Sequence, residues 1–120
     1  MTVRRILVAF DGSEAAYRAL EQAIESADVL EAQIDVVTVL QPEIAAAHQA
    51  AELLIDRGFE PEIHTPTGDP AAQIARLASK GEYDVVYLGT RGRGSLVRAL
   101  EGSVSSTVAE TTDITVVIAR

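Results

Sequence analysis

The chain has 120 residues, of which 48% are apolar and 23% charged, and this predicts one globular domain over residues 1–120. Its formal net charge of −8 opposes binding to nucleic acid and to anionic membrane surfaces. The absence of cysteine excludes disulfides, thiolate catalysis and cysteine-ligated zinc.

The predicted elements alternate between strands and helices along the whole chain. In order they are a strand at 4–10, a helix at 13–30, a strand at 34–40, a helix at 43–57, a strand at 61–66, a helix at 69–81, a strand at 84–88, a helix at 103–111 and a strand at 114–119. The first apolar run, from Ile6 to Phe10, is too short for a signal peptide or a membrane span, so we expect a cytoplasmic protein.

Residues at the ends of the helices match known capping preferences. Ser13 and Asp69 are expected N-caps, and Pro70 fits the first turn of its helix. Gly58 follows the second predicted helix, where a left-handed residue is common. The apolar residues of the first helix form one buried stripe at Ala16, Leu20, Ala23, Ile24 and Ala27.

The order of elements predicts an α/β fold, a single doubly wound parallel sheet of five strands. All strands but 61–66 are near-continuous Val, Ile and Leu, as in strands covered on both faces. Ligands of such sheets bind beyond the carboxyl ends of the strands. The candidate ligand residues therefore follow the strands, at Asp11, Gly12 and Ser13, at 39–42, at 66–69 and from Leu88 onward.

The segment GTRGRGSLVRALEGSVSST, residues 89–107, combines glycines with arginines in an acidic chain. Gly89, Gly92 and Gly94 allow backbone conformations closed to other residues and free N–H groups for a ligand. Gly102 and Ser103 open the last predicted helix, whose first N–H groups favour an anion. These features favour a phosphate group, with countercharge from Arg91, Arg93 or Arg98. The alternative is an ordinary glycine-rich strand exit with a serine cap and solvated arginines.

Two common phosphate motifs are absent. The chain has no G-x-x-x-x-G-K-[ST], since Lys80 is its only lysine, and FDGSEAA stands where a G-x-G-x-x-G would follow the first strand. The chain is therefore neither a P-loop NTPase nor a typical dinucleotide dehydrogenase.

At these residues the sequence resembles the universal stress protein family, and specifically its ATP-binding branch. The pattern G-x2-G-x9-G-[ST] of that branch is matched by Gly89, Gly92, Gly102 and Ser103. The segments ILVAFDGSEAAYRAL, TGDPAAQI, DVVYLGTRGRG and ITVVIAR are similar to other parts of the family. The resemblance implies a Rossmann-like, adenine nucleotide alpha-hydrolase-like fold with strand order 3-2-1-4-5, which binds ATP alone or with Mg²⁺ or Mn²⁺.

The resemblance also implies roles for single residues. Asp11 would contact the ribose or adenine side, Val39 would line the adenine pocket, and Leu88 and Gly89 would flank the base and ribose. The phosphates would be cradled by Gly92, Gly102, Ser103 and Val104. The strand-end residues Gly12, Ser13, Thr90 and Arg91 complete the expected nucleotide contacts.

The family further implies a homodimer, often paired through the final strand, here Ile114 to Ala119. An apolar edge strand left unpaired favours such pairing on physical grounds as well. Family members are usually longer after the second strand, where only Gln41 and Pro42 separate Leu40 from the next predicted helix. We therefore expect the adenine side to be more open.

Several polar residues have a second interpretation. Asp11 could cap the following helix rather than bind ribose or a phosphate-bound divalent metal, although the strand-end position favours the ligand. His48 and His64 have no carboxylate at the spacing of metal ligands, so the sequence favours neither catalysis nor metal binding there. Three glutamates, Glu21, Glu25 and Glu31, are expected on a solvated helix face.

The function best supported by the sequence is a nucleotide-binding stress or signalling module with slow or absent chemistry. The alternative is a slow ATPase or another adenine-nucleotide hydrolase of the same fold, but the chain offers no obvious base and lacks the extra domains of such enzymes. A phosphorylated receiver domain is disfavoured. It needs clustered acidic residues after the first strand, an aspartate at the end of the third strand and a lysine after the fifth strand. This chain has Asp11 alone, then Thr65 and Pro66, and then Ala119 followed by Arg120 at these places.

Overall fold

The computed structural model describes residues 3–39, 45–80, 83–89 and 115–119. In these residues five strands form one parallel sheet in the order β3-β2-β1-β4-β5, which confirms the predicted α/β fold and strand order. The strands are β1 (Arg5–Ala9), β2 (Gln33–Val37), β3 (Ile63–His64), β4 (Val85–Gly89) and β5 (Thr115–Ala119), and the helices are α1 (Glu14–Leu30), α2 (Ala45–Asp56) and α3 (Pro70–Lys80). The predicted helix at 103–111 lies outside the described residues.

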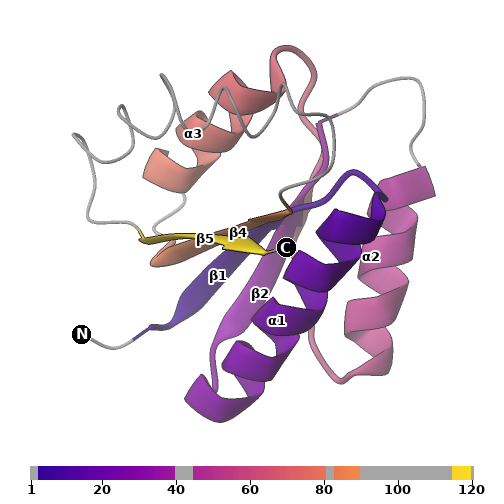
Figure 1. Ribbon diagram of the computed structural model, residues 1–120, viewed down its shortest axis with the longest axis vertical. Helices are drawn as coiled ribbons and strands as arrows, with labels where there is room; N and C mark the ends of the chain where they lie inside the picture. Colours follow the sequence, from indigo (N-terminus) through magenta and orange to yellow (C-terminus); the bar gives the residue numbers. More distant parts are fainter. Residues whose placement is uncertain (1–2, 40–44, 81–82, 90–114, 120) are drawn as a thin grey trace.

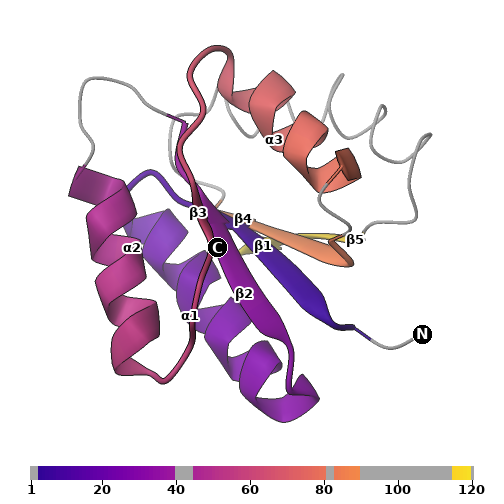
Figure 2. The same cartoon turned by 180° about the vertical axis from the view of Figure 1, so that it is seen from behind.

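The helices cover the sheet from both sides (Figure 1, Figure 2). Helices α1 and α2 lie side by side on one face, and α3 lies on the other. Successive residues of β1 alternate between the two cores: Ile6 and Val8 join the cluster under α1 and α2, whereas Leu7 and Ala9 join the cluster under α3. The central strands are therefore buried on both faces, which explains their continuous apolar sequence.

The helix ends follow the predicted capping residues. The Oγ of Ser13 accepts the N–H of Ala16 at 3.1 Å and so caps α1. Asp69 caps α3 by accepting the N–H of Ala72 at 2.9 Å. Gly58 follows α2 with a φ of 90°, and the predicted left-handed residue is confirmed there.

The first helix ends at an unexpected cap. Glu31, predicted on a solvated helix face, is exposed but adopts a left-handed conformation with a φ of 57°, and its N–H bonds to the carbonyl of Ala27. The other two glutamates of that set, Glu21 and Glu25, are exposed on α1 as predicted. None of the described helices has both the length and the hydropathy needed to cross a membrane.

The third strand is much shorter than the predicted span of 61–66. Only Ile63 and His64 pair with β2, opposite Val36 and Val37. The sequence itself explains the difference, because Pro61 and Pro66 lack the N–H that a sheet ladder needs. The result is a short edge strand with little main-chain pairing to hold it.

Candidate functional site

The strand order reverses between β1 and β4. Strand β1 pairs with β2 on one side and with β4 on the other. The carboxyl ends of β1 and β4 are therefore neighbours, and an open α/β sheet binds its ligands at such a point. The structure thus brings the predicted segment from Asp11 to Ser13, which follows β1, to the same edge of the sheet as Gly89, the last residue of β4.

A tight turn links β1 to α1. Gly12 has a φ of 82°, which side-chain-bearing residues rarely adopt. The carboxylate Oδ1 of Asp11 accepts the N–H of Ser13 at 2.9 Å, while the side chain of Asp11 is exposed. Asp11 therefore stabilises the turn before α1, whereas the N-cap itself is Ser13, and the contact of Asp11 with a ligand stays a prediction.

Gly89 allows β4 to pack directly against the first turn of α1. A Cβ atom added at Gly89 would lie 2.5 Å from the carbonyl carbon of Ala15 and 2.7 Å from the nitrogen of Ala16. These are main-chain atoms of a buried turn, so they cannot move aside cheaply. The sequence attributed this glycine to backbone freedom, but the structure shows close packing as the reason for it.

Thr38 is a buried residue that the sequence analysis did not single out. Its Oγ1 donates to the carbonyl oxygen of Phe10 at 2.9 Å, and its N–H donates to the carbonyl of His64 at 2.9 Å. Thr38 therefore ties the exits of β1, β2 and β3 together, directly below the edge at which a ligand is expected. A threonine directly after an apolar strand is the only sequence signal for this role.

The remaining predicted site residues fall into two groups. Val39 is half-buried against the core under α3, and the side chain of Leu88 is only 1% exposed, so a ligand contact from Leu88 is left to its main chain. The other group lies outside the described residues: Thr90, Arg91, Gly92, Gly102, Ser103 and Val104, together with the further arginines Arg93 and Arg98.

A second polar cluster surrounds a buried carboxylate on β2. Asp35 is 0% exposed, and its Oδ2 accepts the hydroxyl of Tyr83 at 2.7 Å and Nη2 of Arg5 at 2.8 Å. Its Oδ1 accepts the main-chain N–H of Glu62 at 2.9 Å and Nε2 of Gln33 at 3.0 Å. Four donors therefore fill the acceptor positions of the carboxylate, which is how a buried charge becomes tolerable.

These contacts shift the protonation equilibria of the cluster. Burial alone raises the pKa of Asp35, but the hydrogen bonds from Tyr83, the Glu62 N–H, Gln33 and Arg5 together hold that pKa below its ordinary value. Burial and the neighbouring carboxylate raise the pKa of Tyr83 well above that of a free tyrosine. The hydrogen bond to Asp35 likewise raises the pKa of Arg5. The folded state therefore favours an ionised Asp35 and a neutral Tyr83.

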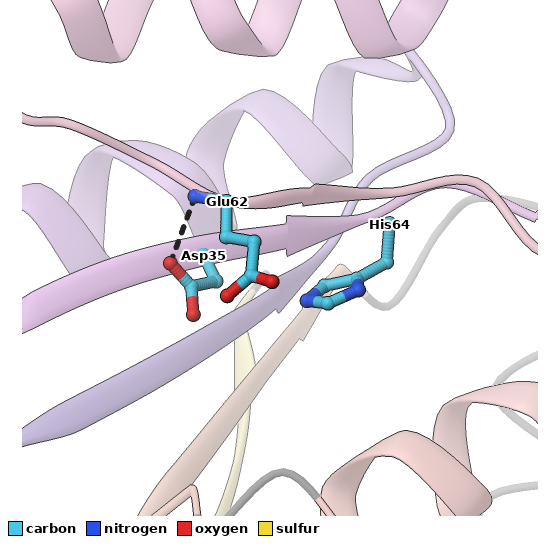
Figure 3. Close-up of side chains that lie close together, drawn as sticks. All are labelled: Asp35, Glu62 and His64. Carbon is cyan, nitrogen blue, oxygen red and sulfur yellow. Dashed lines mark hydrogen bonds between the residues drawn. The ribbon is translucent and has the colours of Figure 1, made fainter.

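His64 and Glu62 complete this cluster on the side of the sheet where α3 lies (Figure 3). The hydroxyl of Tyr83, whose bond to Asp35 is 2.7 Å long, also lies 3.3 Å from Nε2 of His64. Ligand atoms of Asp35, Glu62 and His64 all lie within 4.8 Å of one another. The expectation that His64 has no carboxylate at the spacing of metal ligands is therefore wrong, whereas His48 is exposed on α2.

The comparisons with known proteins agree with this fold. The pattern described as "Universal stress protein family" matches residues 2–53 and 40–120. The chain belongs to the universal stress protein family. A curated relative, universal stress protein MJ0531 of Methanocaldococcus jannaschii, is 27% identical, with 98% of this chain and 82% of the relative covered.

Solved structures of the family superpose on the whole chain. The crystal structure of a universal stress protein in complex with cAMP has a TM-score of 0.77 at 24% identity, covering 100% of this chain and 98% of the other. A universal stress protein from Archaeoglobus fulgidus in complex with dAMP has a TM-score of 0.73 at 22% identity, with 100% of both chains covered. At such identities the likeness establishes the fold, and the ligands named belong to those proteins.

Proposed function

We propose that this chain binds an adenine nucleotide at the carboxyl edge of the sheet, between β1 and β4, and acts as a nucleotide-binding stress or signalling module. The observation that carries the proposal is the reversal of strand order between β1 and β4, which brings the Gly12 turn and Gly89 to the same edge of the sheet. Membership of the universal stress protein family and the cAMP and dAMP complexes of structurally similar proteins support the choice of an adenine compound.

Within this proposal the phosphates bind the loop that follows β4. The pattern Gly89-x2-Gly92-x9-Gly102-Ser103 leaves glycines where main-chain N–H groups can approach an anion. Arg91 supplies countercharge in a chain whose net charge of −8 otherwise repels a nucleotide. ATP is the expected ligand, alone or with Mg²⁺ or Mn²⁺, because a chain of phosphates uses both ends of the pattern.

We also propose that the protein is a homodimer whose two copies pair through β5. Strand β5 lies at the edge of the sheet next to β4, and Ile118 is 38% exposed there. An apolar edge strand of this kind offers unpaired main-chain groups to a second copy. Sedimentation velocity with Ile118→Pro tests the pairing. The N–H of Thr115 donates to the carbonyl of Asp84 beside β4, and N–H directions alternate along a strand, so the N–H of Ile118 points to the open edge. A dimer that persists unchanged in this variant does not use β5.

A cytoplasmic location also remains a prediction from the sequence.

Calorimetric titration with ATP, AMP and GTP, each with Mg²⁺, tests the nucleotide site. We expect ATP to bind the wild-type chain, and Gly102→Val and Arg91→Gln each to weaken binding at least tenfold. Arg57→Gln is the matched control, since Arg57 is exposed beyond the end of α2 and removes the same charge elsewhere. Circular dichroism establishes that each variant is folded.

Four results of this titration would each decide something. Weaker binding in both loop variants but not in Arg57→Gln supports the phosphate loop. Equal affinity in all four proteins contradicts it, and no heat with any adenine nucleotide contradicts the proposed function as a whole. Tighter binding of AMP than of ATP leaves an adenine site but removes the role given to the distal phosphates.

A further inference from the structure

Two side chains of kinds that bind metals lie on one side of the chain at β3. Glu62 directly precedes the strand and His64 ends it, and side chains two apart on an extended chain point to the same side. Asp35 lies beneath them on the neighbouring strand, and the three ligand atoms lie within 4.8 Å of one another (Figure 3). An imidazole with two carboxylates is a donor set that suits zinc and similar first-row metals.

We propose that Asp35, Glu62 and His64 form a binding site for a divalent transition metal of the zinc type, which takes the place of the Arg5 guanidinium. The site lies under the face of β3 and is separate from the residues proposed for the nucleotide. The metal would bind the polar cluster around Asp35, which has no role in the proposed nucleotide site.

Arg5 occupies the position of the cation in the structure. Its Nη2 lies 2.8 Å from Oδ2 of Asp35 and 3.9 Å from Oε2 of Glu62, so one guanidinium bridges two of the three proposed ligands. All four acceptor positions of Asp35 are filled, and a metal therefore gains this ligand only if a donor leaves. Arg5 is the donor that can leave, since its side chain is 30% exposed and can turn to water.

The remaining groups of the cluster accommodate this exchange. Glu62 has a side chain that is 61% exposed, so its carboxylate can move toward a metal without repacking a core. The hydroxyl of Tyr83 keeps its bond to Asp35, and Gln33 and the Glu62 N–H hold Oδ1 in place. The stacking of Arg5 over the Tyr83 ring, at 4.6 Å, opposes the exchange. Metal and guanidinium are thus competitors for one pair of carboxylates.

Metal binding would stabilise the position of β3 at the edge of the sheet. Strand β3 has only two paired residues, and the metal would add a link from β3 to the fully buried Asp35. The chain runs directly from His64 into the turn before α3, at Gly68 and Asp69. Zinc should therefore raise the thermal midpoint of unfolding, in the way any ligand specific to the folded state does.

Titration of the nucleotide-free chain with Co²⁺, followed by its absorption in the visible range and by displacement with Zn²⁺, tests this site. We expect one equivalent to bind, and His64→Gln and Glu62→Gln each to weaken binding at least tenfold. His48→Gln is the matched control, because it removes the other of the two histidines from an exposed helix position. Arg5→Met removes the competitor and should strengthen binding at least tenfold.

The Arg5→Met variant separates this proposal from nonspecific binding of metal to surface carboxylates. Nonspecific binding predicts that Arg5→Met changes the Co²⁺ affinity little and that His64→Gln and His48→Gln have equal affinities. This result would overturn the site. If Arg5→Met does not fold, the histidine pair still decides the question in the wild-type background. The absence of nucleotide keeps the outcome independent of the nucleotide site, so either proposal can fail alone.

Discussion

Replacing Asp35 by asparagine tests the physical account of the buried cluster. Each carboxylate oxygen accepts two donors: Oδ2 from Tyr83 and Arg5, and Oδ1 from Gln33 and the main-chain N–H of Glu62. An asparagine side chain has one oxygen and one NH₂ group. In either orientation of the amide, two donors therefore face another donor, and the Arg5 charge loses its partner.

The magnitude of the effect follows from burial. Removing one partner of a buried, hydrogen-bonded ion pair costs about 3–5 kcal/mol. Because the Arg5 side chain is 30% exposed and can turn to water, we expect the lower end, about 3 kcal/mol. This is a large part of the stability of a typical domain, which is about 5–15 kcal/mol. Asp28→Asn, on an exposed position of α1, is the control and should change stability by less than about 0.5 kcal/mol.

The effect of Asp35→Asn should depend on pH. The folded state lowers the pKa of Asp35 below its ordinary value of about 3.9, so the stabilisation by the carboxylate is fully present above that pH. It is lost as the pH falls through the lower folded pKa, and the asparagine has no such titration. The difference in unfolding free energy between wild type and variant should therefore be constant from about pH 5 to 7 and shrink below about pH 4.

Urea unfolding followed by far-ultraviolet circular dichroism measures this difference, since the chain has no tryptophan. Runs at several pH values between about 3 and 7 give the free energies of both proteins by linear extrapolation. A difference below about 1 kcal/mol at neutral pH would show that the four hydrogen bonds add little beyond solvation. A difference that stays constant down to pH 3 would show that the pKa of Asp35 is not lowered.

Two further substitutions and one control test the packing of β4 against α1 and the stability at alkaline pH. Gly89→Ala places a Cβ 2.5 Å from a main-chain atom of Ala15 and should lower the unfolding free energy by more than about 3 kcal/mol. The control Gly58→Ala has nothing within 4 Å of its Cβ and should lower it by about 1 kcal/mol, because of its positive φ alone. Equal urea midpoints for the two variants would refute the clash at Gly89. Because the pKa of Tyr83 is raised in the folded state, its neutral form stabilises the fold below about pH 10, and the unfolding free energy falls as the pH rises further. Tyr83→Phe should make this decline less steep. An unchanged decline in urea titrations at alkaline pH would contradict the raised pKa.

In the part of the chain that the structure describes, the sequence by itself determined the type and order of the elements and their class, although β3 is shorter than predicted. The caps at Ser13 and Asp69, the left-handed Gly58 and the apolar stripe of α1 are local signals, because each depends on residues within one or two turns. Continuous apolar strands likewise indicate burial on both faces before any partner is known. The family pattern added the strand order, which local signals cannot supply.

Other parts of the site depended on contacts between distant segments. The sequence presents QIDVV as an apolar strand with one acid in it, and only the fold brings Arg5 and Tyr83 to that acid, Asp35, from 30 and 48 residues away. Periodicity along β3 could have paired Glu62 with His64, but the third member comes from another strand.

The reason for Gly89 is of the same kind. A glycine pattern predicts freedom of the main chain, while the closeness of β4 to α1 is a property of two packed surfaces. Secondary structure follows from short-range sterics and hydrogen bonding, which a sequence carries directly. The polar cluster and the close packing arise from long-range burial, where the neighbours of a residue are decided only when the whole sheet has formed.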